Sequence, residues 1–232
     1  MDSPGAIAAA LRADAPVREL FVSDAHRWRT LVSLARERGA AVIDVPERVI
    51  AALSDTSTPQ GAVAVATVPD VRLDDIVGTA SLVVLLADVR DPGNAGTLVR
   101  AAAAARADAV VFAVGSVDAL HPKTVRAAAG ALWQVPVARG LSVEDCIDAL
   151  RSAGLVVVGA DARAVATVDT ADLTRRAAFV LGNEAWGLGR RRELVDELYS
   201  IPMPGPVESL NVGVAGSIFL FEAARQRRHA GD

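Results

Sequence analysis

The sequence predicts an α/β protein built around a parallel β-sheet, and two observations lead to this fold class. Short apolar runs alternate with alanine-rich helical stretches over most of the 232 residues, the pattern typical of strands and helices stacked in layers. One run, 82–87, is apolar at every position, as in strands that are buried on both faces of a parallel sheet. A chain of this length buries a substantial core, as one large domain or two small ones.

Residues 1–68 are expected to form a small α/β domain. The polar stretch 69–79, with Pro69 and Gly78 near its two ends, is interpreted as a linker to a second domain at 80–232. The expected elements of the first domain are helices at 6–13, at 26–38 and after Pro46, and strands at 17–23, 41–45 and 63–68.

The second domain continues the alternation of strand and helix, as the crossovers of a parallel sheet require. It contains no internal repeat and is treated as one unit. Strands are expected at 82–87, 109–114, 135–138, 155–160, 178–181 and 198–201, and helices at 97–106, 121–132, 142–152, 190–195 and 212–226.

Three loops follow strands of the second domain and combine glycine with polar side chains. They span 88–96, 182–189 and 202–211. Because ligands of open parallel sheets bind outside the carboxyl ends of the strands, these loops are expected to border one site. The last loop has three prolines within five residues, which excludes a helix or a central strand and indicates a rigid loop before the next helix.

The first loop carries Asn94, six residues before Arg100. If both were helical, their side chains would diverge by roughly 120°, so Asn94 is expected to precede the helix and to face the same cleft as Arg100. An arginine among alanines is costly to bury without an anionic partner. For Arg100 two interpretations stay open, a buried and paired arginine or an exposed one.

Composition excludes several classes of protein. A single cysteine, Cys146, excludes an internal disulfide and a cysteine-cluster metal site, and the scattered His26, His121 and His229 are not interpreted as metal ligands. No metal is therefore expected. No apolar run is long enough for a membrane span and no signal peptide is recognised, so a cytoplasmic protein is expected.

The net charge of −4 argues against a protein that coats nucleic acid nonspecifically, although a local arginine patch remains compatible with it. The turn 91–96 lacks the G-x-G-x-x-G spacing of dinucleotide sites, and no phosphate-binding Gly-x-x-x-x-Gly-Lys loop occurs. Candidate phosphate contacts, each with a solvated surface residue as the alternative, are Arg106, Lys123, Arg126, Arg139 and 190–192.

Three segments carry a specific resemblance. DVRDPGNAGTLVRAAAAARADAVVF, FVLGNEAWGL and IPMPGPVESLNVGVAGSIFLFEAAR closely resemble the three signature motifs of SpoU/TrmH-type RNA ribose methyltransferases of the SPOUT class. HPKTVRAAAGALWQVPV resembles the segment that this family places between the first two motifs. The resemblance covers about 80–232 and implies a trefoil-knot α/β domain, against the general rarity of knots. It also implies bound S-adenosylmethionine and a homodimer with sites at the subunit interface.

The resemblance assigns site residues by their match to the motifs. The residues implied to bind the cofactor are Leu181, Gly182, Asn183, Gly187, Ile201, Met203, Ser209 and Leu210. The residues implied to be catalytic are Arg100, Asn94, Glu184, Ser209 and Asn211. Arg100 is implied either as the base that removes the hydroxyl proton, helped by an RNA phosphate, or as a group that holds the phosphate and aligns the hydroxyl.

Residues 1–68 resemble the ribosomal-protein-like RNA-binding domain of the family, with TPQGAVAVA as its last strand. The usual basic helix and first strand are not found before Gly5, so either the start is truncated or the domain is reduced. The expected function is methylation of a ribose 2′-hydroxyl of ribosomal RNA. A tRNA 2′-O-methyltransferase and a catalytically inactive RNA-binding or assembly protein of the same fold stay open as alternatives.

Overall fold

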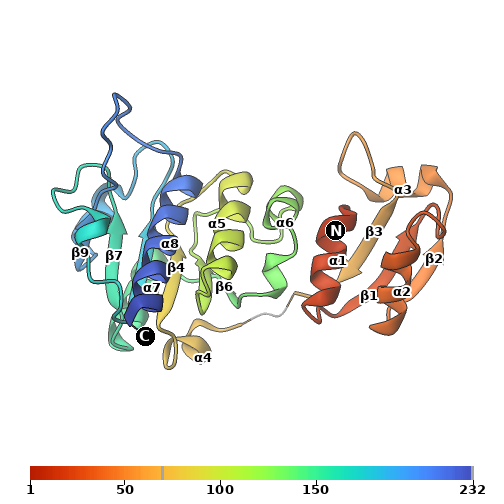
Figure 1. The fold of residues 1–232 in the computed structure, drawn as a ribbon, viewed down its shortest axis with the longest axis horizontal. Helices are drawn as coiled ribbons and strands as arrows, with labels where there is room; N and C mark the ends of the chain where they lie inside the picture. Colours follow the sequence, from red (N-terminus) through yellow and green to blue (C-terminus); the bar gives the residue numbers. More distant parts are fainter. Residues whose placement is uncertain (69–70, 231–232) are drawn as a thin grey trace.

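The structure, a computed structural model, describes residues 1–68 and 71–230, and these residues form two separate β-sheets with their own helices (Figure 1). The first sheet has the order β2-β1-β3, with β1 parallel to β2 and antiparallel to β3. Its elements are α1 (Pro4–Arg12), β1 (Val17–Val22), α2 (Arg29–Glu37), β2 (Ala41–Asp44), α3 (Glu47–Leu53) and β3 (Ala62–Ala66).

The second sheet is parallel throughout and has the order β6-β5-β4-β8-β7-β9. Its strands are β4 (Leu82–Leu86), β5 (Ala109–Phe112), β6 (Val137–Arg139), β7 (Val156–Ala160), β8 (Ala177–Leu181) and β9 (Glu197–Tyr199). Its helices are α4 (Leu73–Val77), α5 (Pro92–Ala104), α6 (Pro122–Ala128), α7 (Val143–Ser152) and α8 (Val212–Ala230), with 3-10 turns η1 (Ala131–Trp133), η2 (Val168–Thr170) and η3 (Gly189–Glu193).

Strand β4 explains how this sheet holds two helical layers. Every residue of β4 is buried, and successive side chains of a strand point to opposite faces. Leu82, Val84 and Leu86 therefore join the core under α5 and α8, whereas Val83 and Leu85 join the core under α4 and α7. The continuous apolar pattern of 82–87 thus marks a central strand, as predicted.

Helix α8 returns from the edge strand β9 to lie beside α5 (Figure 1). A glycine makes this close approach possible, because a Cβ atom on Gly216 would lie 2.4 Å from Leu98 Cδ2 and 2.5 Å from Leu181 Cδ1. The rings of Phe179 and Phe219 meet edge to face at 5.6 Å between centroids and fix α8 on β8. The return path brings the third loop, 202–211, over the carboxyl end of the sheet.

The predicted start of one helix was wrong. Helix α5 begins at Pro92, not at residue 97, and Asn94 lies inside it. Proline is favourable at the first helical position, and Asp91 caps the helix by accepting a hydrogen bond from the Asn94 backbone N–H at 2.9 Å. Asn94 and Arg100 are thus both helical and point in different directions.

Two further differences concern segments next to the strands. The helix expected at 121–132 is interrupted where Ala129 and Gly130 both adopt left-handed conformations, with φ of 48° and 88°. The stretch interpreted as a linker contains α4, whose Leu73, Ile76 and Val77 are buried, although Pro69 and Asp70 lie outside the described residues. Where the two domains divide stays a prediction.

Candidate active site

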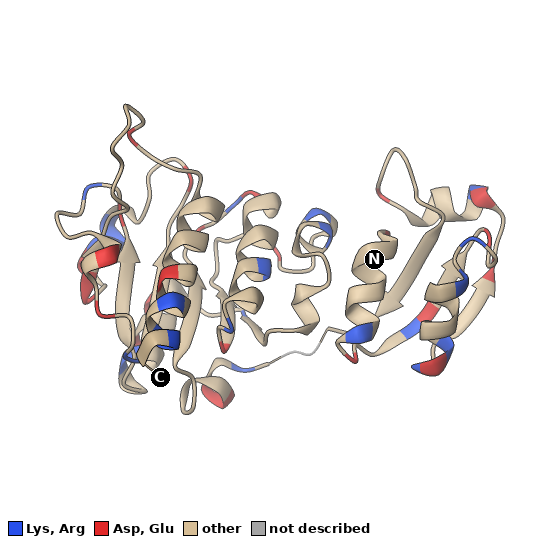
Figure 2. Cartoon of the chain, in the orientation of Figure 1, with Lys and Arg blue, Asp and Glu red and all other residues tan. Residues whose placement is uncertain are grey.

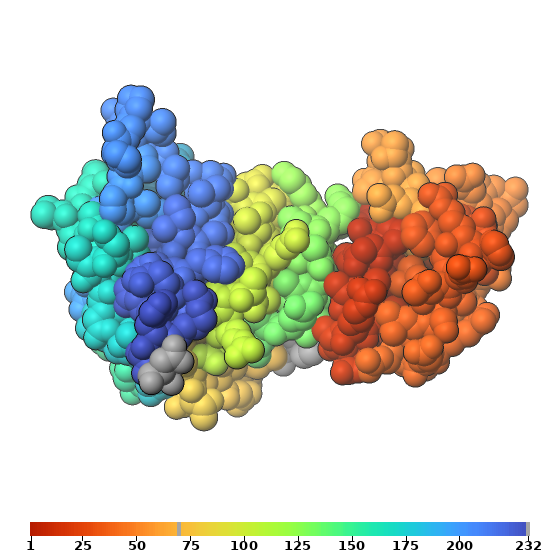
Figure 3. All heavy atoms as spheres, viewed as in Figure 1, coloured from red at the N-terminus to blue at the C-terminus, as the bar shows by residue number. Residues whose placement is uncertain are grey.

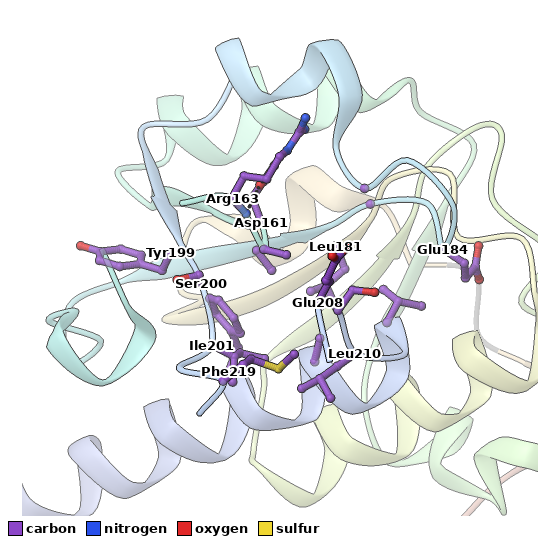
Figure 4. Close-up of a pocket in the computed structure, with 18 of the residues that line it drawn as sticks. Asp161, Arg163, Leu181, Glu184, Tyr199, Ser200, Ile201, Glu208, Leu210 and Phe219 are labelled. Atoms are coloured by element: carbon purple, nitrogen blue, oxygen red, sulfur yellow. Dashed lines mark hydrogen bonds and ion pairs between the residues drawn. The ribbon is translucent and has the colours of Figure 1, made fainter. Parts of the chain in front are cut away.

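A cavity of about 800 Å³ opens at the carboxyl ends of β7, β8 and β9 (Figure 4). Apolar side chains of Leu181, Ile201 and Phe219 line it, together with the acidic residues Glu184 and Glu208. All eight residues implied as cofactor contacts line it: Leu181, Gly182, Asn183, Gly187, Ile201, Met203, Ser209 and Leu210. Their assignment as cofactor contacts stays a prediction, but the structure places them around one cavity.

The second loop owes its shape to Gly182 and Asn183. A Cβ atom on Gly182 would lie 2.3 Å from the carbonyl carbon and oxygen of Gly187, so only glycine lets the loop close on itself. Asn183 and Gly187 exchange two backbone hydrogen bonds of 2.9 Å. The buried Asn183 amide donates to the Asp88 carbonyl at 2.9 Å and accepts from the Ala185 N–H, which ties the second loop to the first.

A hydrogen-bond network then joins all three loops. Glu184 Oε1 accepts from Asn94 Nδ2 at 3.0 Å and from the Asp91 backbone N–H at 3.1 Å. Asn94 Oδ1 in turn accepts from Asn211 Nδ2 at 2.9 Å. Asn211 Oδ1 accepts from the Gly213 backbone N–H at the start of α8. The structure therefore brings together three of the five residues implied to be catalytic.

The network holds Glu184 as a carboxylate. Partial burial alone would raise the pKa of Glu184, but the Asn94 amide and the backbone N–H groups around it outweigh burial, so the pKa is lowered from its ordinary value. Asp91 also has a lowered pKa, because Lys123 Nζ donates to it at 3.0 Å and the Asn94 N–H donates as well. Both carboxylates are ionised at neutral pH.

Arg100 and Ser209, the other two residues implied to be catalytic, are exposed. Ser209 lines the cavity, whereas Arg100 does not. Neither side chain makes a hydrogen bond or ion pair with any residue in the described part of the chain. For Arg100 the interpretation as a buried, paired arginine is wrong, and the exposed one holds.

Several residues at the cavity were missed from the sequence. Asp161, which follows β7 directly, has a buried side chain paired with Arg192 Nε at 3.2 Å, and its Oδ1 accepts from the Arg163 backbone N–H at 2.8 Å. Trp186 is half exposed and lies 5.3 Å below the Arg90 guanidinium. Asp161 could have been recognised from the sequence as a site residue, because it follows a strand at its carboxyl end. The Arg90–Trp186 contact could not, because the two residues are far apart in the sequence.

Four of the candidate phosphate contacts have partners within the chain instead, among them Arg139 with Asp118 at 3.7 Å and Arg192 with Asp161 at 3.2 Å. Arg126 Nη1 pairs with Asp2 at 3.0 Å, and Lys123 pairs with Asp91. Basic and acidic residues are intermixed over the helices (Figure 2). In residues 1–68 and 71–230 no group of three or more His, Cys, Asp or Glu residues is placed to hold a metal ion. No helix in the same residues is long and apolar enough to cross a membrane.

The cavity fits S-adenosylmethionine in size and chemistry. Its volume lies within the range of about 300–1,000 Å³ usual for small-molecule sites. The apolar lining residues suit the adenine ring, and the acidic ones suit the positive sulfonium and ammonium groups. The cavity also lies where open parallel sheets bind ligands, outside the carboxyl ends of the strands.

The parallel six-stranded sheet, the cavity and the three-loop network agree with the SPOUT class of RNA methyltransferases that the motifs resemble, and comparison with known proteins establishes that class. The model of the SpoU rRNA methylase family matches residues 81–221, and the model of the RNA 2′-O ribose methyltransferase substrate-binding domain matches residues 5–72. The chain belongs to the SpoU rRNA methylase family, and the predicted resemblance is confirmed.

Individual relatives match this chain over more than nine tenths of its length. An AdoMet-bound rRNA methyltransferase from Sinorhizobium meliloti superimposes with a TM-score of 0.83 at 31% identity, over 99% of this chain and 86% of that one. The SpoU methyltransferase AviRb from Streptomyces viridochromogenes gives 0.83 at 32%, over 99% and 90%. The 23S rRNA (guanosine(2553)-2′-O)-methyltransferase RlmP of Bacillus subtilis is 34% identical over 91% of this chain and 82% of its own. The predicted SPOUT fold class is thereby confirmed.

Proposed function

We propose that this protein transfers the methyl group of S-adenosylmethionine to a ribose 2′-hydroxyl of ribosomal RNA. The observation that carries the proposal is the Asn94–Glu184–Asn211 network at the mouth of a cavity that fits the cofactor. Family membership supports it, as do relatives whose names state AdoMet binding and 23S rRNA 2′-O-methylation. Action on ribosomal RNA implies a cytoplasmic location.

In this proposal the eight cavity residues hold the cofactor, which supplies an electrophilic methyl group when bound. Asn94 and Glu184 are held rigid by their hydrogen bonds and orient the target nucleotide. Arginine stays protonated at neutral pH, so we assign to Arg100 the binding of an RNA phosphate and the alignment of the hydroxyl. Alignment alone contributes much of the rate in such transfers.

We further propose that the enzyme is a homodimer. Val214 and Phe221 on α8 lie one heptad apart and are each about half exposed, at 48% and 50%, and Val207 and Leu210 in the preceding loop are exposed as well. Helix α8 packs beside α5, which carries Arg100, a side chain with no polar partner among the described residues. A second copy covering this apolar face would bring another chain's cavity towards Arg100 and complete a site at the interface.

Transfer of labelled methyl from S-adenosylmethionine to unmodified rRNA and tRNA, followed by digestion to nucleosides, tests the proposal. A labelled 2′-O-methylnucleoside from rRNA is the expected result. Label in tRNA alone would keep the chemistry and overturn the substrate. A protein that binds the cofactor and RNA but transfers no label would be the inactive RNA-binding protein of the same fold.

A further inference from the structure

Helix α6 lies between the catalytic sheet's α5 and the N-terminal α1, and it touches both at glycine contacts. On the α5 side, a Cβ atom on Gly96 would lie 2.5 Å from Ala127 Cβ and 2.6 Å from the Thr124 carbonyl oxygen. The two helices therefore meet backbone to backbone. Gly96 lies between Asn94 and Arg100 on the same helix, so this contact fixes α6 relative to the active site.

On its other side, α6 is followed by a turn that packs against α1. Gly130 has a φ of +88°, and a Cβ atom there would lie 2.5 Å from Ala9 Cβ and 3.1 Å from the Ala10 backbone nitrogen. Figure 3 shows α1, in red, against the green segment that contains α6 and η1. No side chain larger than hydrogen fits between these surfaces without moving one of them.

Hydrogen bonds and an ion pair stabilise the contact between the two domains at two separate places. Asp2, with a side chain only 9% exposed, accepts from Arg126 Nη1 of α6 and from Ser54 Oγ, both at 3.0 Å. Trp133 of η1 donates its Nε1 hydrogen to the Thr67 carbonyl at 3.0 Å and packs against the cores of both sheets. Because these bonds lie at different points of the surface, they oppose rotation as well as separation.

We infer that α6 and η1 (122–133) are a rigid spacer that sets the position of the N-terminal RNA-binding sheet relative to Asn94 and Arg100. The inference rests on the proposed function, because it concerns which ribose of a bound RNA reaches the site. Residues such as Gly130 and Arg126 are then specificity-determining positions, although they contact neither cofactor nor reacting atoms. A displacement of about 1 Å at a reacting centre already costs up to about 100-fold in rate.

The test combines a distance measurement with RNA kinetics on the full chain. Spin labels on cysteines at two exposed positions, Arg36→Cys in α2 and Val165→Cys beyond β7, report the distance between the sheets, while the native Cys146 is buried. Gly130→Ala is compared with Gly140→Ala, whose φ of +91° imposes the same backbone strain but whose Cβ would meet nothing within 4 Å.

A narrow distance distribution is expected for the unsubstituted spacer and for Gly140→Ala. Gly130→Ala should broaden it and raise the KM for rRNA about tenfold or spread methylation over neighbouring nucleotides, with S-adenosylmethionine affinity unchanged within about twofold. If Gly130→Ala does not fold, Arg126→Gln and Asp2→Asn, singly and together, replace it, and their effects on RNA KM should not add.

Three results would overturn the inference. A broad distribution with the unsubstituted spacer would show that no rigid spacer exists. A broadened distribution in Gly130→Ala with unchanged RNA KM and methylation site would show that the spacing does not set specificity. Absence of RNA methylation by the wild-type protein would overturn the inference together with the proposed function, whatever the distances show.

Discussion

The first turn and the middle of helix α5 behave differently, although both carry residues that match the family's catalytic positions. At its N-terminal end, Asn94 is bound on both sides, by Glu184 and by Asn211. Less than two turns further on, Arg100 is exposed and has no polar partner among the described residues. Folding of one chain thus fixes Asn94 in a network and leaves Arg100 exposed, in line with the proposal that another molecule completes the site there.

The largest effect is expected from Arg100, because we assign to it the binding of the RNA phosphate and it makes no polar contact with the residues that the structure describes. Arg100→Ala should lower kcat/KM for RNA methylation about 100-fold or more, while the melting temperature and the affinity for S-adenosylmethionine stay as in the wild type. Arg100→Lys keeps the charge but loses the planar pair of donors, so it should recover little of the methylation activity. A large loss of thermal stability in Arg100→Ala would contradict the conclusion that, unlike Asn94, Arg100 does not stabilise the fold.

The apolar face of α8 tests whether a second copy completes the site. Val214→Asp with Phe221→Asp should give a monomer in sedimentation analysis and abolish methylation, because carboxylates are not buried in an apolar interface. Mixing inactive Arg100→Ala and Gly182→Ala proteins sharpens the test. If Arg100 serves the partner's cavity, mixed dimers regain activity, whereas recovery should not occur if each chain uses its own Arg100.

A substitution at Gly182 tests the cavity, which is formed by one chain alone. Gly182→Ala should lower the free energy of unfolding by about 1–3 kcal/mol, as overpacking does, and should abolish cofactor binding measured by calorimetry. Gly205→Ala is the matched control in the third loop, since a Cβ atom there meets nothing within 4 Å. Equal effects of the two substitutions would indicate that loop closure at Gly182 is unimportant.

Removal of the Glu184 charge is expected to have a smaller effect on methylation activity. Its pKa is lowered in the folded state from the ordinary 4.5, so its charge stabilises the fold fully above pH 4.5, and this stabilisation is lost as the pH falls through the lower folded pKa. Glu184→Gln should lower kcat/KM about tenfold, the equivalent of one hydrogen bond to a charged group. The stability difference between the two proteins in chemical denaturation should shrink below pH 4.5.

Much of the fold was predictable because local patterns and burial agree. The uniform apolar run at 82–87 could belong only to a strand covered on both faces, and β4 is that strand. The start of α5 was misplaced because the Asp91-Pro92 pair was interpreted as part of a turn, although the same pair is a good cap and first residue of a helix. Helix α4 was missed because Leu73, Ile76 and Val77 lie among acidic residues in a short polar stretch.

The sequence alone determined the class of the protein and eight of the residues around its cavity, because these depend on motifs whose side chains and glycines have fixed local roles. Only the tertiary structure decided that Asn94 bonds to both Glu184 and Asn211, that Asp161 pairs with Arg192, and that Arg100 has no polar partner within 1–68 and 71–230. Such contacts join residues up to 117 positions apart, so they depend on how the loops meet at the end of the sheet. Local sequence patterns predicted that the three loops border one site, but not which of their side chains bond to one another.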